Sequence, residues 1–219
     1  MRHGDIVEKF GENSAVGTST ETVWSPGGLY VYPSADGVLT VASDAGGTDE
    51  GGQVTIQGCN EANTEVEATV TLDVTGAATT TEQFFRVFRA FYADTVTTGT
   101  VTISHGTLTV AQVAAAVRQT QMAVYSAVDR GKRCFITFVK YESGANDEVD
   151  FWLFVRNSPT KPFRARDSAL SSGGPVPHPF VSGVEVPIGG DVEVRAARVS
   201  GASARVTAEF TVEYRAESG

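Results

Sequence analysis

Apolar and polar side chains alternate along two segments of the chain. Residues 64–72 place Thr, Val, Ala, Val and Leu on one side and residues such as Glu65 and Glu67 on the other. Residues 206–215 repeat this alternation, with Val, Ala, Phe and Tyr opposite charged residues and threonine. Because successive side chains of a strand point to opposite faces, a period of two indicates a strand with one buried face. Both segments are therefore predicted to be amphipathic strands.

Two other segments are apolar on both faces. Residues 84–92 are dense in aromatic side chains, and residues 149–155 read Val-Asp-Phe-Trp-Leu-Phe-Val. A strand that is covered on both faces lies between the layers of a fold or at a contact between subunits. We predict such a strand for each segment.

Shorter β-favouring runs predict the remaining strands, which are residues 29–32, 38–41, 54–56, 99–103, 122–125, 134–141 and 192–196. Turn-rich intervals predict hairpins between the first two of these runs and between 122–125 and 134–141. Residues 109–118 are rich in alanine and could form a helical turn or two. Roughly ten to twelve short strands are typical of a sandwich or barrel. The predicted fold is all-β, an antiparallel, jelly-roll-like β-sandwich.

The chain divides into four predicted segments. Residues 1–20 carry mixed charge without apolar periodicity, which indicates an extended N-terminal arm. Residues 21–157 are predicted to form the main β-sandwich. Five of the eight prolines crowd residues 158–179, and a central strand does not tolerate that density, so a Pro/Gly-rich loop is predicted there. Residues 180–219 are predicted to add C-terminal strands to the same domain.

The charge of the chain narrows the classes of partner. The formal net charge is −9 and the isoelectric point is about 4.8. Affinity for nucleic-acid phosphates comes from clustered Lys and Arg, so no nucleic-acid partner is expected. The residues after Met1 are polar, and no apolar run reaches about 18 residues. Neither a signal peptide nor a membrane partner is therefore expected.

The histidines and cysteines offer little for catalysis or metal binding. His3, His105 and His178 lie apart from any nucleophile motif, and the sequence contains no nucleophile elbow, phosphate loop or zinc-protease motif. Cys59 and Cys134 lack the spacing of a zinc site. Cys134 lies in an apolar run and is interpreted as a buried hydrophobic residue. The sequence leaves open whether the two cysteines form a disulfide.

Two groups of carboxylates are candidate sites. Residues 44–50 contain three carboxylates that could bind calcium, but they lack the alternating ligand spacing of an EF-hand loop, so a solvated loop is favoured. Glu65 and Glu67 lie about 7 Å apart on one strand face. A solvating role is favoured for them over glycoside hydrolysis. We expect no enzymatic activity, no cofactor and no metal.

Aromatic residues and arginines supply the candidate interface. Arg86 and Arg89 lie inside the aromatic run, where a buried cation needs a carboxylate, carbonyl or aromatic partner. A structural ion pair and a subunit contact are the two interpretations. Trp24 is either a core anchor or an interface anchor. The candidate subunit or capsid interface comprises Trp24, Tyr30, Tyr32, Phe84, Arg86, Phe88 and Arg89.

Four stretches of the chain resemble, in the same order, a group of small virion proteins of tailed bacteriophages. These stretches are residues 21–32, 54–58, 85–90 and 119–125. The resemblance spans about residues 10–140 and does not cover residues 160–219. It departs at residues 128–132, where the group has a Pro-Ala-Gly-Lys turn and this chain reads Val-Asp-Arg-Gly-Lys.

The resemblance implies a structural protein of a bacteriophage virion. The expected role is capsid decoration (cement), as a homotrimer that binds the major capsid protein on the outer capsid surface after synthesis in the host cytoplasm. In this hypothesis residues 1–20 act as a clamp on the shell. The alternative is a tail-associated or head-fibre protein that binds a host surface glycan through residues 43–52 and 158–179. A glycan-active enzyme is a third hypothesis.

Overall fold

The computed structural model describes residues 6–93 and 97–216 and confirms the all-β prediction. Apart from the single 3-10 turn η1 (Gly46–Asp49), the regular elements of the described residues are all strands. No helix in these ranges is long and apolar enough to cross a membrane. The strands are β1 (Ile6–Val16), β2 (Glu21–Thr22), β3 (Leu39–Ser43), β4 (Gln53–Cys59), β5 (Glu65–Thr71), β6 (Ala77–Thr79), β7 (Arg86–Tyr92), β8 (Val101–His105), β9 (Leu108–Val113), β10 (Val124–Ser126), β11 (Arg133–Arg156), β12 (Arg164–Val186), β13 (Asp191–Arg198) and β14 (Ala204–Arg215).

The chain forms two compact units, one inserted into the other. The discontinuous unit comprises residues 1–30 and 122–219, and the inserted unit comprises residues 31–121. Within the discontinuous unit, Trp24 and Met122 form an isolated antiparallel bridge. The chain therefore leaves this unit and returns to it at adjacent positions. These units differ from the predicted segments, because sequence periodicity identifies strands but not which strands pair.

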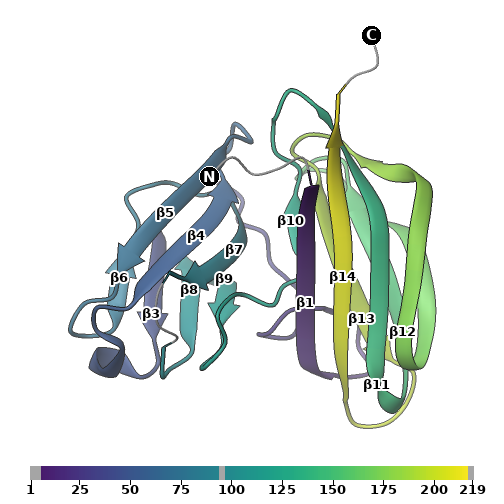
Figure 1. The fold of residues 1–219 in the computed structure, drawn as a ribbon, viewed down its shortest axis with the longest axis horizontal. Helices are drawn as coiled ribbons and strands as arrows, with labels where there is room; N and C mark the ends of the chain where they lie inside the picture. Colours follow the sequence, from purple (N-terminus) through teal and green to yellow (C-terminus); the bar gives the residue numbers. More distant parts are fainter. Residues whose placement is uncertain (1–5, 94–96, 217–219) are drawn as a thin grey trace. The chain divides into compact units, whose positions relative to one another are not determined.

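A long two-stranded ribbon organises the discontinuous unit. Strands β11 and β12 pair along almost their whole length, but their register shifts between Ser143 and Glu148. Asn146 and Gly173 have φ angles of 68° and 90° at this shift, and such left-handed conformations bend the chain. Before the shift β11 pairs with β14, and after it β11 pairs with β13. Figure 1 shows the ribbon curling at its lower end.

The bent ribbon contributes to two layers that face each other. Layer A contains β1, β14, residues 133–143 of β11 and residues 174–186 of β12, and layer B contains the other halves of β11 and β12 with β13, β10 and β2. Between the layers, the Oη atoms of Tyr125 and Tyr214 lie 2.9 Å apart. The predicted β-sandwich is thus confirmed.

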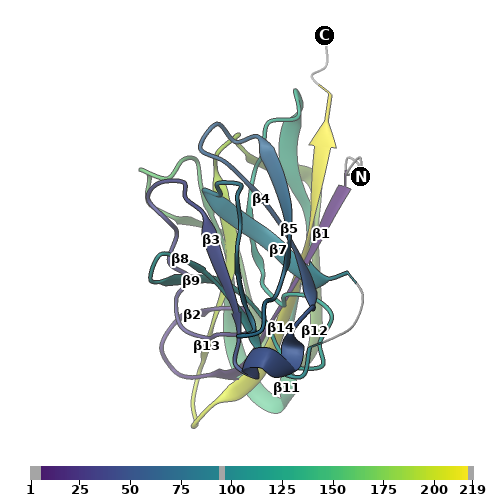
Figure 2. The same ribbon diagram turned by 90° about the vertical axis from the view of Figure 1, so that its left-hand side faces the viewer.

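The inserted unit contains two antiparallel sheets. One has the strand order β6-β3-β8-β9 and the other has the order β5-β4-β7. Figure 2 shows η1 as one coil in the connection that follows β3. Both sheets bury apolar side chains completely, including Leu39, Val41, Val54, Ile56, Ala90 and Ile103.

The prediction of an extended arm at residues 1–20 is wrong for the described part of that segment. Strand β1 pairs with β14 through most of its length. Its inward positions include Lys9 and Asn13, which are buried, and these polar residues hide the alternation that identifies a strand. A Cβ atom at Gly11 would lie 2.3 Å from Ala123 N, so only glycine permits this close approach of β1 to the segment before β10.

The prediction of a loop at residues 158–179 is also wrong, because β12 begins at Arg164. Three of its prolines, Pro175, Pro177 and Pro179, occupy alternate positions and pair with alternate residues of β11. Alternate residues direct their backbone nitrogens to the same side, so all three missing N–H groups fall on the side away from β11. Among the described strands β12 pairs with β11 alone, which makes it an edge strand that tolerates proline.

Three smaller predictions are wrong as well. Residues 29–32 form no strand, and β10 pairs with β13 rather than with residues 134–141. The alanine-rich segment contains β9 instead of a helical turn, because Val110, Ala111 and Val113 are fully buried in its sheet. The strands predicted at 54–56, 64–72, 84–92, 192–196 and 206–215 are confirmed.

Candidate functional site

Most of the predicted interface residues lie inside the protein. Trp24, Tyr30, Phe84, Arg86 and Phe88 are buried. The other two residues of the prediction, Tyr32 and Arg89, are half-buried. Trp24 and Tyr30 belong to the discontinuous unit, and the remaining five belong to the inserted unit.

Trp24 anchors the point where the chain leaves the discontinuous unit. Its indole Nε1 donates to Gly27 O at 2.8 Å, and the Tyr30 ring meets its ring edge-on at 5.0 Å. Tyr30 N in turn donates to the hydroxyl of Thr22 in β2. These contacts hold residues 24–30 against β2 of layer B. Trp24 therefore acts as a core anchor within its own unit.

The buried Arg86 side chain contacts backbone carbonyl groups and aromatic rings. Its Nη1 donates to Pro33 O at 2.8 Å and to Phe85 O at 2.9 Å. The guanidinium lies 3.7 Å from the centre of the Phe85 ring and 5.1 Å from that of Tyr32. Carbonyl and aromatic partners of this kind offset the cost of burying the cation. Within the inserted unit, the structure thus brings Arg86 and Tyr32 together.

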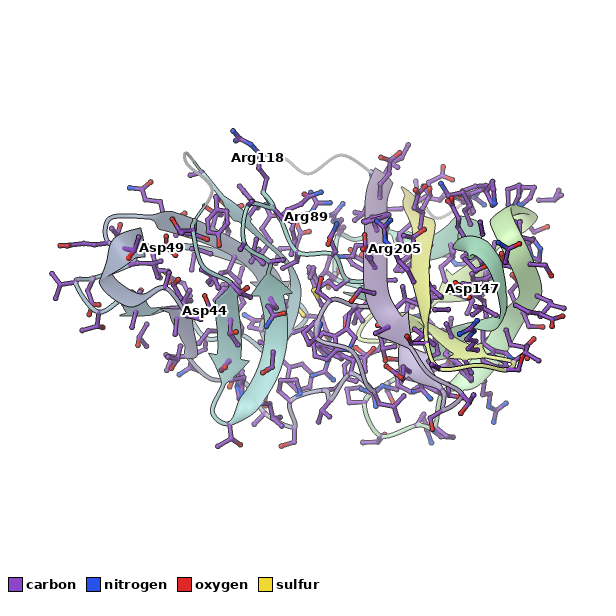
Figure 3. The ribbon with its side chains drawn as sticks, turned by 90° about the horizontal axis from the view of Figure 1, so that it is seen from below. Asp44, Asp49, Arg89, Arg118, Asp147 and Arg205 are labelled. Atoms are coloured by element: carbon purple, nitrogen blue, oxygen red, sulfur yellow. The ribbon has the colours of Figure 1, made fainter. Side chains whose placement is uncertain are left out.

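The acidic stretch at residues 44–50 is an ordered structural element. The Asp49 carboxylate accepts hydrogen bonds from Thr98 N at 2.7 Å, Gly99 N at 3.0 Å and the Ser43 hydroxyl. Burial raises the pKa of Asp49, but these donors outweigh burial and hold the pKa below its usual value. Figure 3 labels Asp49 and Asp44 on the same unit. The described residues contain no cluster of three or more His, Cys, Asp or Glu suited to a metal ion.

Three exposed carboxylates of the inserted unit lie on β5 or in the turn before it. Glu65 and Glu67 are exposed on one face of this strand, and Glu61 is exposed in the turn before it. Glu67 accepts a hydrogen bond from Gln57 on β4. Residues 31–121 contain ten Asp and Glu against three Arg and no Lys. We call Glu61, Glu65 and Glu67 the acidic strip.

The described cysteines and histidines lie in the protein core, in an ion pair or at a strand end. Cys59 and Cys134 are buried thiols in different units, and burial raises the pKa of Cys134 to about 12. His178 Nδ1 lies 2.8 Å from the Asp167 carboxylate. His105 lies at the end of β8, and His3 falls outside the described residues.

A hollow of about 250 Å³ lies on the outer side of layer A, lined by Phe10, Glu142, Ser143, Gly144, Arg205, Thr207 and Glu209. Two of its charged groups have partners, since Arg205 pairs with Glu12 at 2.8 Å and Glu209 pairs with Lys140 at 2.7 Å. Figure 3 labels Arg205 at this position. The hollow is thus lined by groups that stabilise the sheet surface.

Sequence reasoning missed a set of arginines and aromatic residues on layer B. The Arg156 guanidinium lies 4.7 Å from the Phe163 ring, and that of Arg195 lies 4.7 Å from the Phe154 ring. Arg195 also pairs with the fully buried Glu193. Burial raises the pKa of Glu193, while Arg195 opposes this shift. Trp152, Phe154 and Arg156 occupy alternate positions of one strand, and this spacing could have indicated that they share a face. Phe163 could not be added to that face, because residues 158–179 were predicted to form a loop.

Comparisons with known proteins give little further information. No protein-family model matches the chain, and no curated protein matches it. A structure of the infectious bursal disease virus Gx strain aligns with 98% of this chain and 73% of that chain at 9% identity, with a TM-score of 0.29. The VP2 subviral particle of the same virus aligns with 98% and 77% at 11% identity, with a TM-score of 0.17. Similarities this weak carry no argument about fold or function.

Proposed function

We propose that this chain is a structural protein of a bacteriophage virion, without enzymatic activity, that decorates the outer surface of the head and stabilises contacts between major capsid proteins. The observation that carries the proposal is the position of the four stretches that resemble small virion proteins. Residues 21–32 and 119–125 contain the two crossing points between the units. Residues 54–58 lie in β4, and residues 85–90 begin one residue before β7, the strand that pairs directly with β4.

The chemistry of the described residues agrees with a binding role. Buried ionisable groups such as Asp49, Arg86 and Glu193 are held by hydrogen bonds and aromatic contacts that stabilise the fold. A shell protein needs broad and rigid surfaces, because many modest contacts add up over a symmetric capsid. Two compact β-rich units in one chain supply such surfaces.

Binding to capsids that lack this protein tests the proposal. Added protein is expected to bind purified capsids to saturation, at a fixed ratio to the major capsid protein, and to raise the temperature at which the heads open. Absence of binding would overturn the decoration role. Deletion of residues 1–20 would not test the clamp hypothesis, because it would remove β1 from layer A.

One observation favours the alternative of a tail-associated or head-fibre protein that binds a glycan. Phe163, from the proline-rich segment, lies beside Arg156 and Arg195, and the half-buried Trp152 of β11 pairs with Arg195. Aromatic rings beside polar groups can stack on sugars. In that case the protein would bind host polysaccharide on an array and would leave capsids unoccupied.

A further inference from the structure

The hollow on the outer side of layer A lies over three neighbouring strands. Thr207 of β14 pairs with Glu12 of β1 on one side and with Glu142 of β11 on the other. Glu209, two residues further along β14, pairs with Phe10 of β1. The Cβ atoms of directly opposite residues lie about 5 Å apart, and the next residue on the same face lies about 7 Å along the strand. The register of the sheet therefore gathers these side chains around one spot.

Small residues create the hollow among longer ones. Gly144 has no side chain and Thr207 has a short one, whereas Phe10, Glu142, Arg205 and Glu209 line the same hollow with long side chains. Its volume of about 250 Å³ is smaller than the roughly 300–1,000 Å³ of sites for drug-sized ligands. The hollow is therefore suited to one small ring rather than to an extended chain.

Two ion pairs fix the charged walls of the hollow without using all of their hydrogen-bonding capacity. Arg205 Nε and Nη2 donate to the Glu12 carboxylate at 2.8 and 3.0 Å, and Lys140 Nζ donates to Glu209 at 2.7 Å. A guanidinium has five N–H donors and a carboxylate has about four lone-pair sites. Arg205 thus keeps donors, and Glu209 keeps acceptors, for a ligand. Side chains already held in this way lose little entropy when a ligand binds.

Glu142 and Thr207 are the polar side chains of the hollow that the fold does not engage. Among the described residues, no hydrogen bond or ion pair reaches the Glu142 carboxylate or the Thr207 hydroxyl. Both residues are half-buried. The hydrogen bond and charge of Glu12 raise the pKa of Arg205, and the charge of Glu142 adds to this shift, so Glu142 lies near the guanidinium. An acceptor and a hydroxyl therefore remain open beside a fixed donor.

This mixture of groups selects the class of ligand. Arg205 only donates hydrogen bonds, Glu142 only accepts them, and Thr207 does both. Sugar hydroxyls also donate and accept, so one sugar can satisfy all three groups. The half-buried Phe10 ring offers an apolar face for the C–H groups of a sugar ring. An ammonium group would be repelled by Arg205 and Lys140, and a phosphate by Glu142.

We propose that this hollow binds a single uncharged sugar residue. Hydroxyl groups of the sugar donate to Glu142 and accept from Arg205 and Thr207, while one face of its ring packs on Phe10. The site lies on the outer side of layer A and is separate from Phe163 and its neighbours on layer B. The inference does not depend on a role in a virion.

Titration of the full chain with simple glycosides, followed by amide NMR spectra, tests the site. The probes are the methyl glycosides of glucose, galactose, mannose and N-acetylglucosamine. At least one is expected to bind with a dissociation constant of about 1–10 mM, because a single sugar makes few contacts, and to shift the amide signals of Gly144 and Thr207. If none shifts these signals at about 50 mM, the proposal is overturned. The same holds if n-butylammonium or inorganic phosphate shifts them at lower concentration than every glycoside.

Matched variants assign the binding to this hollow. Glu142→Gln keeps the shape of the side chain, removes its charge and is expected to weaken glycoside binding about tenfold. Glu148→Gln makes the same change at an exposed position in the other half of β11 and should leave binding unchanged. Phe163→Ala should also leave it unchanged, and circular dichroism verifies that each variant folds. Binding that Glu142→Gln does not weaken, or that Phe163→Ala abolishes, would contradict a site in this hollow.

Discussion

The rings of Tyr141 and Phe151 stack with their centroids 5.2 Å apart and their planes inclined by 27°, although both residues belong to β11. The bend between residues 143 and 148 turns the strand back so that its halves face each other. The pair therefore lies between layers A and B and joins the two halves of the ribbon. Both rings are completely buried.

We expect Phe151→Ala to destabilise the discontinuous unit by about 3–5 kcal/mol, because it leaves a cavity between the layers. Tyr141→Phe keeps the stacked ring and removes only the hydrogen bond from Tyr141 Oη to Asp167, so it should cost about 1 kcal/mol. Urea denaturation measures both variants. Equal losses in the two variants would contradict an important role for the stacked rings.

The alternating prolines of β12 are expected to keep its outer edge from pairing with other chains. Replacing Pro175, Pro177 and Pro179 by Thr supplies three N–H groups on that edge. Light scattering should then show concentration-dependent assembly that the wild-type protein lacks at about 0.5 M salt. Pro159→Thr, outside the strand, is the control. A triple variant that scatters like the control would contradict this role.

Asp49 makes the stability of the inserted unit depend on pH. Its pKa is lower in the folded protein than in the unfolded chain, so its contribution is complete above the unfolded pKa and is lost as the pH falls through the folded pKa. Asp49→Asn should cost about 1–3 kcal/mol at pH 7. The difference between variant and wild type should shrink once the pH falls below about 4. Thermal melts across this range measure it, and a difference independent of pH would count against the carboxylate.

Ala116 has a φ angle of 60°, a left-handed conformation that costs a residue with a Cβ atom about 1 kcal/mol. Ala116→Gly should relieve this strain and raise the melting temperature. Ala115→Gly is the matched control and should lower the melting temperature, because it only adds flexibility to the unfolded chain. Identical shifts in both variants would be inconsistent with strain at Ala116.

The discontinuous unit should fold without the inserted unit, because Trp24 and Met122 are bridged within it. Joining Tyr30 to Met122 through a short Gly-Ser linker is expected to give a soluble protein with a cooperative unfolding transition. Replacing Trp24 by Ala in the shortened protein should destabilise it strongly. A shortened protein without cooperative unfolding would show that the inserted unit supports the fold.

Local alternation predicted the strands whose one face is purely apolar. Residues 206–215 form β14, with Val206, Ala208, Phe210, Val212 and Tyr214 buried as their spacing indicates. Strand β1 was missed because Lys9 and Asn13 point inward. Strand β12 was missed because its prolines indicate a loop unless the strand is known to lie at an edge. Edge position and pairing depend on contacts distant in sequence, which no local pattern carries.

The predicted interface shows the same limit. Aromatic density in residues 84–92 identified a covered strand, but it did not indicate whether its own chain or a partner covers it. The structure buries Phe84, Arg86 and Phe88. The arginines and aromatic residues of layer B instead lie on β11, on β13 and just before β12, and they are recognisable as a group only when these strands are paired.

The number of copies per virion tests the proposed decoration role most directly. Quantitative mass spectrometry of purified virions, with the major capsid protein as the internal standard, gives this number. A decoration protein should be present in hundreds of copies at a fixed ratio to the capsid protein, because it occupies equivalent sites over the shell. A dozen copies or fewer, or none, would contradict the proposal.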